Sequence, residues 1–360
     1  MSELPVDPLE LAVQWRDEGQ PVAVATVLQT WGSSPRPAGS QLVVNGSGEF
    51  AGSVSAGCVE SSVIAKSTEV LRHGRPEILE MGIDDGMAWE VGLSCGGQIS
   101  ILVERIETGA GELDRLLRAR REGRPAVMAT ELESGARRLF VPDGGTPPSD
   151  TGDPIERAAL ESLAANRCQR TTIDSTPLFL HPYRRNPRLV VIGAVHIAEP
   201  LVPMARISGF EIVLVEPRQA FADRPSFEEV PLLRRWPTEA FFELGLDADT
   251  AVVALTHDPK IDDVALALAL QSQAFYVGAL GSRRTQERRR HRLREKGLPA
   301  SLIDALHGPV GLAIGALSPA EIAVSILAEI IATRRSQPGD GASRRGSETA
   351  VATPSKATPT

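Results

Sequence analysis

The stretch from Arg188 to Glu216 constrains the fold of this chain more than any other. It begins with a short apolar run, Leu189–Ile192, which ends at Gly193, and a helix-like segment then leads to a second apolar run, Ile212–Val215. Runs of this kind are typical of strands buried in a parallel sheet. A strand, a tight turn, a helix and a second strand that ends in an acid form the plan of a dinucleotide-binding unit. The sequence therefore predicts a Rossmann-like unit.

The glycine pattern of this unit departs from the usual fingerprint. Gly193 and Ala198 fit its first and third positions, but Val195 stands where a second glycine normally lets the backbone approach a pyrophosphate. Glu216 stands at the position of the acid that accepts hydrogen bonds from ribose hydroxyls. Two interpretations stay open from this motif alone: a nucleotide-type site, and a Rossmann-like unit retained only as a scaffold.

The whole chain has 360 residues, enough for two or three domains of an α/β protein. We expect a small N-terminal α/β domain over 1–106, a connecting α+β segment with a linker over 107–187, and a Rossmann-like domain over 188–334. Strands of this last domain are expected near 189–193, 211–216, 231–234, 250–256, 274–278 and 310–314. Helices between most of these strands favour one mostly parallel, doubly wound sheet. Residues 335–360 lack aromatics and are expected to form a disordered tail.

Composition limits the classes of partner and the compartment. A net charge of −8 provides no basic excess for binding nucleic acid. The N-terminus has neither a basic region nor an apolar stretch, so we expect no signal peptide, and no apolar run is long enough for a membrane span. The three cysteines are widely spaced and odd in number, which argues against a disulfide framework and favours the cytoplasm. They also lack the spacing of a metal site, so we expect no metal ligands.

Candidate ligand-binding residues follow the expected strands, because open α/β sheets bind ligands beyond the carboxyl ends of their strands. These residues are Gly193, His196, Glu216, Arg218, His257, Asp258, Gly281, Ser282, Arg283 and Arg284. Two imidazoles, carboxylates, cations and a Gly-Ser turn at a helix start suit an anionic ligand that carries a phosphate.

Each of these features has a purely structural alternative. His196 is also explained as a packed side chain, and His257 with Asp258 as the cap of the following helix. The run 283–296 holds eight cations, for which a solvated, charge-rich helix is the ordinary explanation. Only Arg283 and Arg284 are close enough to the expected strand end to reach a phosphate.

Two cysteines in the N-terminal region are candidates for chemistry. Cys58 follows Ala-Gly at the expected start of a helix, where the helix dipole and free N–H groups favour a thiolate. Cys95 lies in a Ser-Cys-Gly-Gly turn just before a strand. A buried structural role is the alternative for both, and Cys168 has no feature that singles it out. A cysteine hydrolase also stays open, although no nucleophile elbow is present.

Taken together, several stretches resemble the XdhC/CoxI accessory proteins of molybdenum hydroxylases over nearly the whole expected ordered length. They are TWGSSPRPAG at 30–39, GSVSAGCVE at 52–60, GLSCGG at 92–97, IGAVHIA at 192–198, VEPR at 215–218, THDPKIDD at 256–263, YVGALGSRRT at 276–285 and GPVGLAIGALSPAEIAVSILAE at 308–329. Val195 and Glu216 depart from the glycine and aspartate usual in the family.

The resemblance implies a cofactor chaperone rather than a turnover enzyme. Such proteins carry the molybdenum cofactor as molybdopterin or molybdopterin cytosine dinucleotide, assist its sulfuration with a cysteine desulfurase, and pass it to an apo molybdenum hydroxylase. The clients are of the xanthine dehydrogenase, aldehyde oxidase or CO dehydrogenase type. Cys58 or Cys95 would then relay sulfur or contact the cofactor, and we expect a homo-oligomer. The alternatives are an NAD(P)-dependent oxidoreductase and a scaffold protein with a vestigial nucleotide site.

Overall fold

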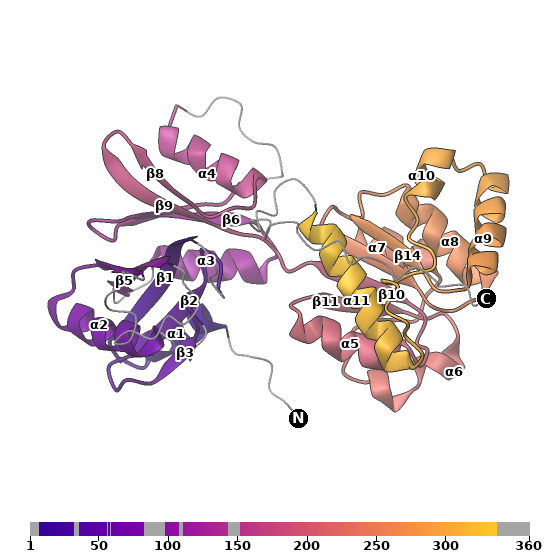
Figure 1. The fold of residues 1–360 in the computed structure, drawn as a ribbon, viewed down its shortest axis with the longest axis horizontal. Helices are drawn as coiled ribbons and strands as arrows, with labels where there is room; N and C mark the ends of the chain where they lie inside the picture. The colour runs from indigo at the N-terminus through magenta and orange to yellow at the C-terminus, as the bar shows by residue number, and fades with distance from the viewer. Residues whose placement is uncertain are drawn as a thin grey trace, which may run out of the picture.

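A computed structural model of the chain describes residues 7–31, 36–55, 57, 59–82, 98–107, 111–142 and 152–336. These residues form three sheets, whose strand orders are β3-β2-β1-β5-β4, β7-β6-β9-β8 and β12-β11-β10-β13-β14. We call them the first, middle and parallel sheets. The first two lie in one half of the molecule and the parallel sheet lies in the other (Figure 1).

The strands are β1 Val22–Trp31, β2 Gln41–Asn45, β3 Phe50–Gly52, β4 Glu77–Met81, β5 Gln98–Arg105, β6 Ala126–Glu131, β7 Arg137–Phe140, β8 Gln169–Ile173, β9 Thr176–Tyr183, β10 Arg188–Ile192, β11 Glu211–Val215, β12 Leu232–Leu233, β13 Thr250–Ala254 and β14 Tyr276–Ala279. The α-helices are α1 Pro8–Asp17, α2 Glu60–His73, α3 Glu112–Arg121, α4 Pro154–Ala164, α5 Ala198–Ile207, α6 Gln219–Ala222, α7 Pro237–Leu244, α8 Pro259–Leu270, α9 Arg283–Glu295, α10 Ala300–Asp304 and α11 Pro319–Arg335. A 3₁₀ turn, η1, spans Pro225–Phe227.

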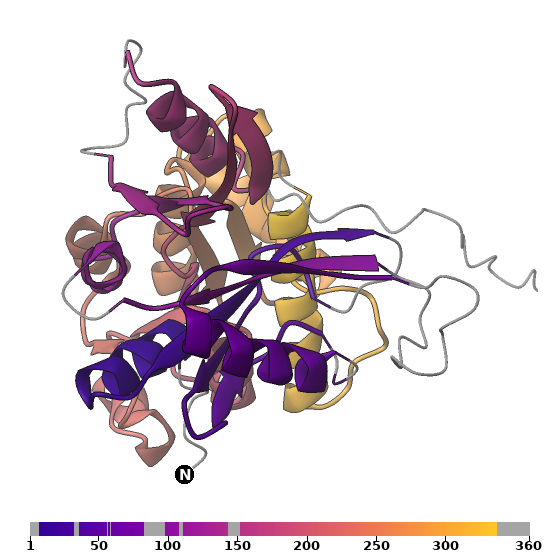
Figure 2. The same cartoon turned by 90° about the vertical axis from the view of Figure 1, so that its left-hand side faces the viewer.

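The first sheet is antiparallel and buries both faces, because its side chains alternate between two cores. Val63 and Val70 of α2 pack on one face with Ala25 and Val27 of β1. The neighbouring residue Val24 faces the other core, which also contains residues of α1, α3 and the middle sheet. Figure 2 shows α2 on the side of the first sheet away from the middle sheet. The segment 107–187 thus contains a sheet of its own and shares a core with the N-terminal elements.

The parallel sheet confirms the expected Rossmann-like architecture. Ile192 of β10 is paired with Val215 of β11 on one side and with Ala254 of β13 on the other, so these three strands end at the same level. Helices α5 and α11 cover one face, and α7, α8, α9 and α10 cover the other. The chain therefore winds outward from β10 in both directions, which makes the gap between the ends of β10 and β13 the topological switch point.

The sixth strand expected near 310–314 is absent from the described structure. His307 makes an isolated bridge with Gly278, and the Val310 N–H donates to the Ala279 carbonyl oxygen at 3.1 Å. Extended pairing then stops at Gly311, whose φ of +95° is incompatible with a strand. The apolar run continues as an irregular segment that leads from the carboxyl edge of the sheet to α11.

Helix starts follow the capping signals of the sequence. Asp7 accepts from the N–H of Leu9 at the start of α1, and Ser318 with Glu321 completes a capping box at the start of α11. Helix α11 extends to Arg335, so the start of the disordered tail expected over 335–360 was placed too early. Residues 337–360 lie outside the described residues. None of the helices in the described part of the chain is both long and apolar enough to cross a membrane.

Candidate functional site

The carboxyl edge of the parallel sheet brings the candidate residues together from four strands. His196 follows β10, Glu216 and Arg218 follow β11, His257 and Asp258 follow β13, and residues 281–284 follow β14. Because β11, β10, β13 and β14 are consecutive neighbours in a parallel sheet, all four loops emerge on the same side. The described structure therefore places the ten candidates from the second half of the chain at one edge.

Gly193 shapes the turn that follows β10. Its φ is +110°, and a Cβ atom built on it would lie 2.6 Å from Cγ2 of Thr256. The turn after β10 and the loop after β13 are consequently in van der Waals contact at the switch point. A side chain at position 193 would meet both backbone strain and a steric clash.

Glu216 is fully buried and its carboxylate is saturated by groups of the protein. Oε2 accepts from the Ala194 N–H at 3.0 Å and from Arg218 Nη2 at 2.8 Å, while Oε1 accepts from the Arg218 N–H and Nε at 3.0 and 2.8 Å. These hydrogen bonds raise the pKa of Arg218. The geometry differs from the expectation that Glu216 binds a ribose, because the carboxylate instead ties the β11 loop to the turn after β10.

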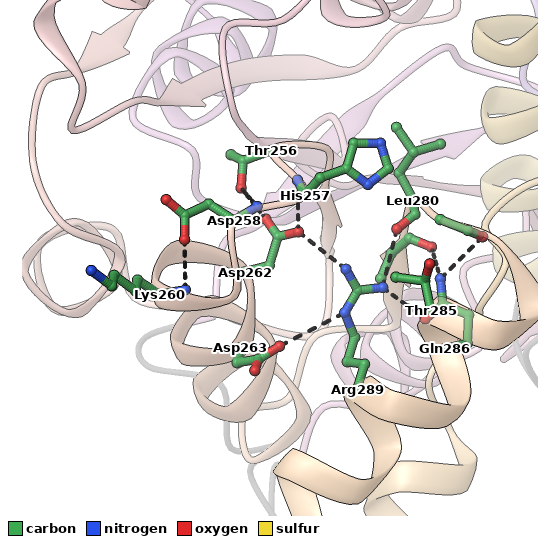
Figure 3. Close-up of polar contacts among 12 residues, drawn as sticks. Thr256, His257, Asp258, Lys260, Asp262, Asp263, Leu280, Thr285, Gln286 and Arg289 are labelled. Carbon is green, nitrogen blue, oxygen red and sulfur yellow. Dashed lines mark hydrogen bonds and ion pairs between the residues drawn. The ribbon is translucent and has the colours of Figure 1, made fainter.

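Asp262 anchors the loop after β13 from below (Figure 3). It is fully buried in the first turn of α8 and accepts from the Thr256 hydroxyl at 2.5 Å and from the His257 N–H at 3.1 Å. Burial raises the pKa of this carboxyl, against the opposing effect of the Thr256 hydroxyl. His257 is held with a φ of +63°, a conformation that residues with a Cβ atom rarely adopt.

Arg289 of α9 links this loop to the one after β14. Its guanidinium donates to Asp262 Oδ2 at 3.1 Å, to the Leu280 carbonyl oxygen at 3.1 Å and to Gln286 Oε1 at 2.7 Å. Gln286 in turn donates to the Ala279 carbonyl oxygen at 2.8 Å (Figure 3). Arg289 and Gln286 are both buried, so α8, α9 and two loops of the candidate site form one connected hydrogen-bond network.

At the starts of α8 and α9, exposed cationic side chains have no ion-pair partner among the described residues. They are Lys260 at the start of α8 and Arg283 and Arg284 at the start of α9. His257 is exposed as well, and the His196 side chain is 76% exposed, with Nδ1 3.8 Å from an oxygen of Glu199. In a protein of net charge −8, such a collection at one edge favours an anionic ligand.

The structure shows the local contacts of the candidates for which the sequence leaves a structural alternative open. His196 is not a packed side chain, since it lies exposed in the turn before α5. Asp258 is a helix cap, with its carboxylate accepting from the Lys260 N–H at 2.9 Å. Ser282 is likewise the N-cap of α9 and accepts from the Thr285 N–H at 3.2 Å. Gly281, with a φ of +137°, provides the turn that precedes this cap.

Sequence reasoning missed the residues that hold the loops in place: Thr256, Asp262, Gln286 and Arg289. Arg289 is hidden in a run of cations for which solvation is the expectation, although it is 2% exposed. The spacing of Gln286, Arg289 and Leu293 on one side of α9 is the available signal, and with a single apolar member it is too weak to use.

Of the three cysteines, Cys168 alone lies among the residues that the structure describes. Cys58 and Cys95 lie outside the described residues, so their proposed chemistry stays a prediction. Cys168 packs near Gly39, and burial raises the pKa of its thiol to about 12, which makes it a poor nucleophile. In the parts of the chain that are described, no group of three or more His, Cys, Asp or Glu side chains is placed to hold a metal ion.

A small cavity lies away from this edge, between the first and middle sheets. It has room of about 30 Å³ and is lined by polar groups that include Glu104, Arg137, His181 and Tyr183. This space accommodates one or two water molecules but no cofactor. The candidate ligand site is therefore the open edge of the parallel sheet rather than this cavity.

Comparison with known proteins gives two family matches. Residues 189–330 match the XdhC Rossmann domain, and residues 15–82 match the XdhC and CoxI family. A probable xanthine dehydrogenase subunit of Bacillus subtilis is 26% identical, with 89% of this chain and 95% of that protein covered. The molybdenum cofactor insertion chaperone PaoD of Escherichia coli is 26% identical, with 92% and 89% covered.

A solved structure has the same fold. It is the crystal structure of a xanthine dehydrogenase from Bacillus halodurans, 25% identical to this chain, with a TM-score of 0.72. The match covers 93% of this chain and 99% of the other. The similarity therefore extends over both halves of the molecule rather than over the Rossmann-like part alone.

Proposed function

Since the chain belongs to the XdhC and CoxI family, we propose that it is a chaperone that binds the molybdenum cofactor and delivers it to an apo molybdenum hydroxylase. A relative that covers most of the chain is named a molybdenum cofactor insertion chaperone, and another is named as part of a probable xanthine dehydrogenase. The cofactor is cargo in this proposal, bound and released without turnover.

The observation that carries the proposal is the set of unpaired cations around a rigid turn, among the residues that the structure describes. Molybdopterin ends in a phosphate, and its dinucleotide form contains a pyrophosphate, so either form presents the anion that this edge suits. Arg283 and Arg284, exposed at the start of α9, would bind it through charge-assisted hydrogen bonds, while His196, Lys260 and His257 would add donors at the same edge. The dinucleotide form is the better match for the switch point of a Rossmann-like sheet.

An NAD(P)-dependent oxidoreductase fits the same edge less well. Glu216 would have to bind the ribose of a nicotinamide cofactor, but both of its oxygens already accept hydrogen bonds from Ala194 and Arg218. Val195 also leaves a side chain where close approach of a pyrophosphate requires glycine. These two features favour a ligand bound nearer to Arg283 than to Glu216.

We propose further that Cys58 or Cys95 takes part in sulfuration, with a cysteine desulfurase as sulfur donor. The support for this step is the position of both cysteines in stretches of small residues that carry the resemblance to the family. In this scheme the parallel sheet holds the cofactor phosphate, and the N-terminal region supplies the thiol. Binding and sulfuration are then separable functions.

The test is retention of purified molybdenum cofactor in gel filtration, with molybdenum and pterin quantified in the protein peak. Near-stoichiometric retention is expected for the wild type, and the double variant Arg283→Glu/Arg284→Glu should lose at least about tenfold in affinity through charge reversal. Arg288→Glu is the matched control, because Arg288 is exposed on the same helix but further from the edge. Cys58→Ala and Cys95→Ala should retain the cofactor while lowering its sulfur content.

Two results would contradict the proposal. Wild-type protein that retains no cofactor, where PaoD retains it under the same conditions, would leave a scaffold with a vestigial site. Nicotinamide fluorescence that reports tight NADH binding, with no pterin retained, would instead support the oxidoreductase.

A further inference from the structure

Residues 312–317, which we call the apolar loop, expose three large aliphatic side chains. Leu312, Ile314 and Leu317 are 43%, 54% and 90% exposed. A single exposed aliphatic residue is ordinary on a protein surface, whereas several within one short segment are typical of a contact surface. The apolar loop belongs to none of the helices and strands, and none of the candidate residues described above lies in it.

The apolar loop is held by hydrogen bonds at both ends. Just before it, the Gly311 N–H donates to Oε2 of Glu329 at 2.8 Å. The same oxygen accepts from the Tyr276 hydroxyl at 2.6 Å, which ties Glu329 to β14. At the other end, the Leu317 N–H donates to Oε2 of Glu321 at 2.7 Å. A loop fixed in this way binds a ligand with a smaller loss of conformational entropy than a mobile one.

The apolar loop begins at the same edge of the parallel sheet as the cations of the candidate site. The Val310 N–H donates to the Ala279 carbonyl oxygen at the end of β14, and Arg283 follows four residues after Ala279. Gly308 contacts α9, since a Cβ atom built on it would lie 2.6 Å from Oε1 of Gln286. The loop leads into α11 on one face of the sheet, whereas α9 packs on the other face. This edge therefore has an apolar segment on one side and cations on the other.

We infer that the apolar loop binds the flat heterocyclic ring of the ligand whose phosphate the cations bind. Ligand sites commonly combine apolar walls with a few charged groups that fix the orientation of the ligand. Val195, half-buried in the turn after β10, adds an aliphatic side chain at the same edge. The inference rests on the proposed function, in which the ring is the pterin or, in the dinucleotide form, the cytosine.

The composition of the apolar loop favours a flat ring over a protein surface. Ala313, Gly315 and Ala316 separate the aliphatic residues, and a Cβ atom built on Gly315 would meet open space. Small residues of this kind let a ligand approach the backbone closely. The loop also has no polar side chain, whereas the rim of a protein interface is polar.

The experiment measures binding of the ring without the phosphate. A phosphate-free oxidised pterin is titrated into the full chain and followed by its fluorescence, and the wild type should bind it with a Kd of about 1 mM or lower. Leu312→Ser/Ile314→Ser should weaken this binding by at least about tenfold through lost apolar contact, with an unchanged circular dichroism spectrum. Ile207→Ser is the matched control, because Ile207 is 72% exposed at the end of α5, at the opposite edge of the sheet.

Charge reversal separates the two parts of the ligand. Arg283→Glu/Arg284→Glu should lose the complete cofactor but bind the free pterin within about threefold of the wild type, since the two parts bind independently. Leu312→Ser/Ile314→Ser should lose both. Cytidine is added as a competitor: displacement of the pterin assigns the loop to either ring of the dinucleotide form, and no displacement assigns it to the pterin alone.

Three results would overturn the inference. They are a wild type that binds neither ring, pterin binding that Leu312→Ser/Ile314→Ser leaves unchanged, and a change of sedimentation coefficient in this variant with unchanged pterin binding. The last result would identify the loop as a contact with a second copy. Cofactor retention by the wild type in any of these cases would leave the proposed function intact, whereas pterin binding without cofactor retention would contradict the proposed function alone.

Discussion

At the scale of single residues, the shape of the candidate site depends on close contacts between neighbouring loops. Gly193 illustrates this, because its positive φ is combined with a Thr256 methyl group where a Cβ atom would lie. Gly209, at the end of α5, has a φ of +84° but open space around it. Substituting each glycine therefore distinguishes the cost of backbone strain, which both positions share, from the cost of a steric clash, which only position 193 adds.

Gly209→Ala should lower the free energy of unfolding by about 1–2 kcal/mol through backbone strain alone. Gly193→Ala should cost about 1–3 kcal/mol more, because the new methyl group overlaps Cγ2 of Thr256. Thr256→Ser removes that methyl group but keeps the hydroxyl that donates to Asp262, so it should recover part of the loss when combined with Gly193→Ala. Urea titration of the four variants measures this, and equal losses for both glycines would rule out the steric explanation.

A second prediction at this scale concerns the buried Arg289. Arg289→Met leaves the carboxylate of Asp262 buried without its guanidinium partner, and should lower the free energy of unfolding by about 3–5 kcal/mol. Arg288→Met changes the neighbouring, exposed arginine and should stay within about 0.5 kcal/mol of the wild type. Thermal unfolding at a single protein concentration measures both. Similar stabilities for the two variants would mean that the network around Asp262 contributes little.

At the scale of elements, local signals in the sequence mark helix starts and tight turns. Ser318 and Glu321 form the capping box that begins α11, and the Asn45-Gly46 pair, a common hairpin-turn pattern, lies between β2 and β3. Strand prediction was wrong at 310–314, where the apolar pattern suggested a strand but Gly311 bends the chain away from the sheet. An apolar run by itself does not distinguish a strand from an irregular segment, and in this one Leu312 and Ile314 are exposed.

The capping box of α11 provides a prediction for this scale. Ser318→Ala removes the oxygen that accepts from the Glu321 N–H and should lower the free energy of unfolding by about 1 kcal/mol. Ser318→Asp retains an acceptor at the same position and should remain close to the wild type. Chemical denaturation at fixed protein concentration is the measurement. A Ser318→Asp variant that is as unstable as Ser318→Ala would point to a role of the serine other than capping.

At the scale of the whole molecule, the packing of the middle sheet on the first sheet buries polar groups. His181 of β9 lies at this boundary, next to Gly39 and Tyr183. Burial, with a smaller contribution from the charge of Arg120, lowers the pKa of His181 to about 3 from an ordinary value of 6.5. The folded protein therefore keeps this imidazole neutral at pH values where the unfolded chain is protonated.

Stability should consequently fall as the pH falls. Above pH 6.5 the imidazole is neutral in both states and has no linked effect, whereas between about pH 6.5 and 3 the unfolded chain binds the extra proton. The loss attributable to His181 should reach about 2 kcal/mol at pH 5. His181→Gln should flatten the difference in unfolding free energy between pH 7.5 and pH 5, while His291→Gln, an exposed histidine of α9, should leave it unchanged. Equal pH profiles for all three proteins would show that protonation of His181 is not coupled to unfolding.

The sequence by itself determined the α/β class, the Rossmann-like unit, the helix caps and the family, because each depends on local patterns or on residues read in order. It also placed the ten candidate residues at the ends of strands, from Gly193 to Arg284, since parallel strands bring successive loops to one edge. The tertiary structure alone decided which contacts those residues make. The Glu216 carboxylate accepts hydrogen bonds from Ala194 and Arg218. Arg289 of α9 is buried and donates to Asp262 of α8, whereas Arg283 and Arg284 of the same helix are exposed. The contacts of Glu216 with Ala194 and of Arg289 with Asp262 join residues 22 and 27 positions apart, and burial sets their energies, which no local pattern encodes.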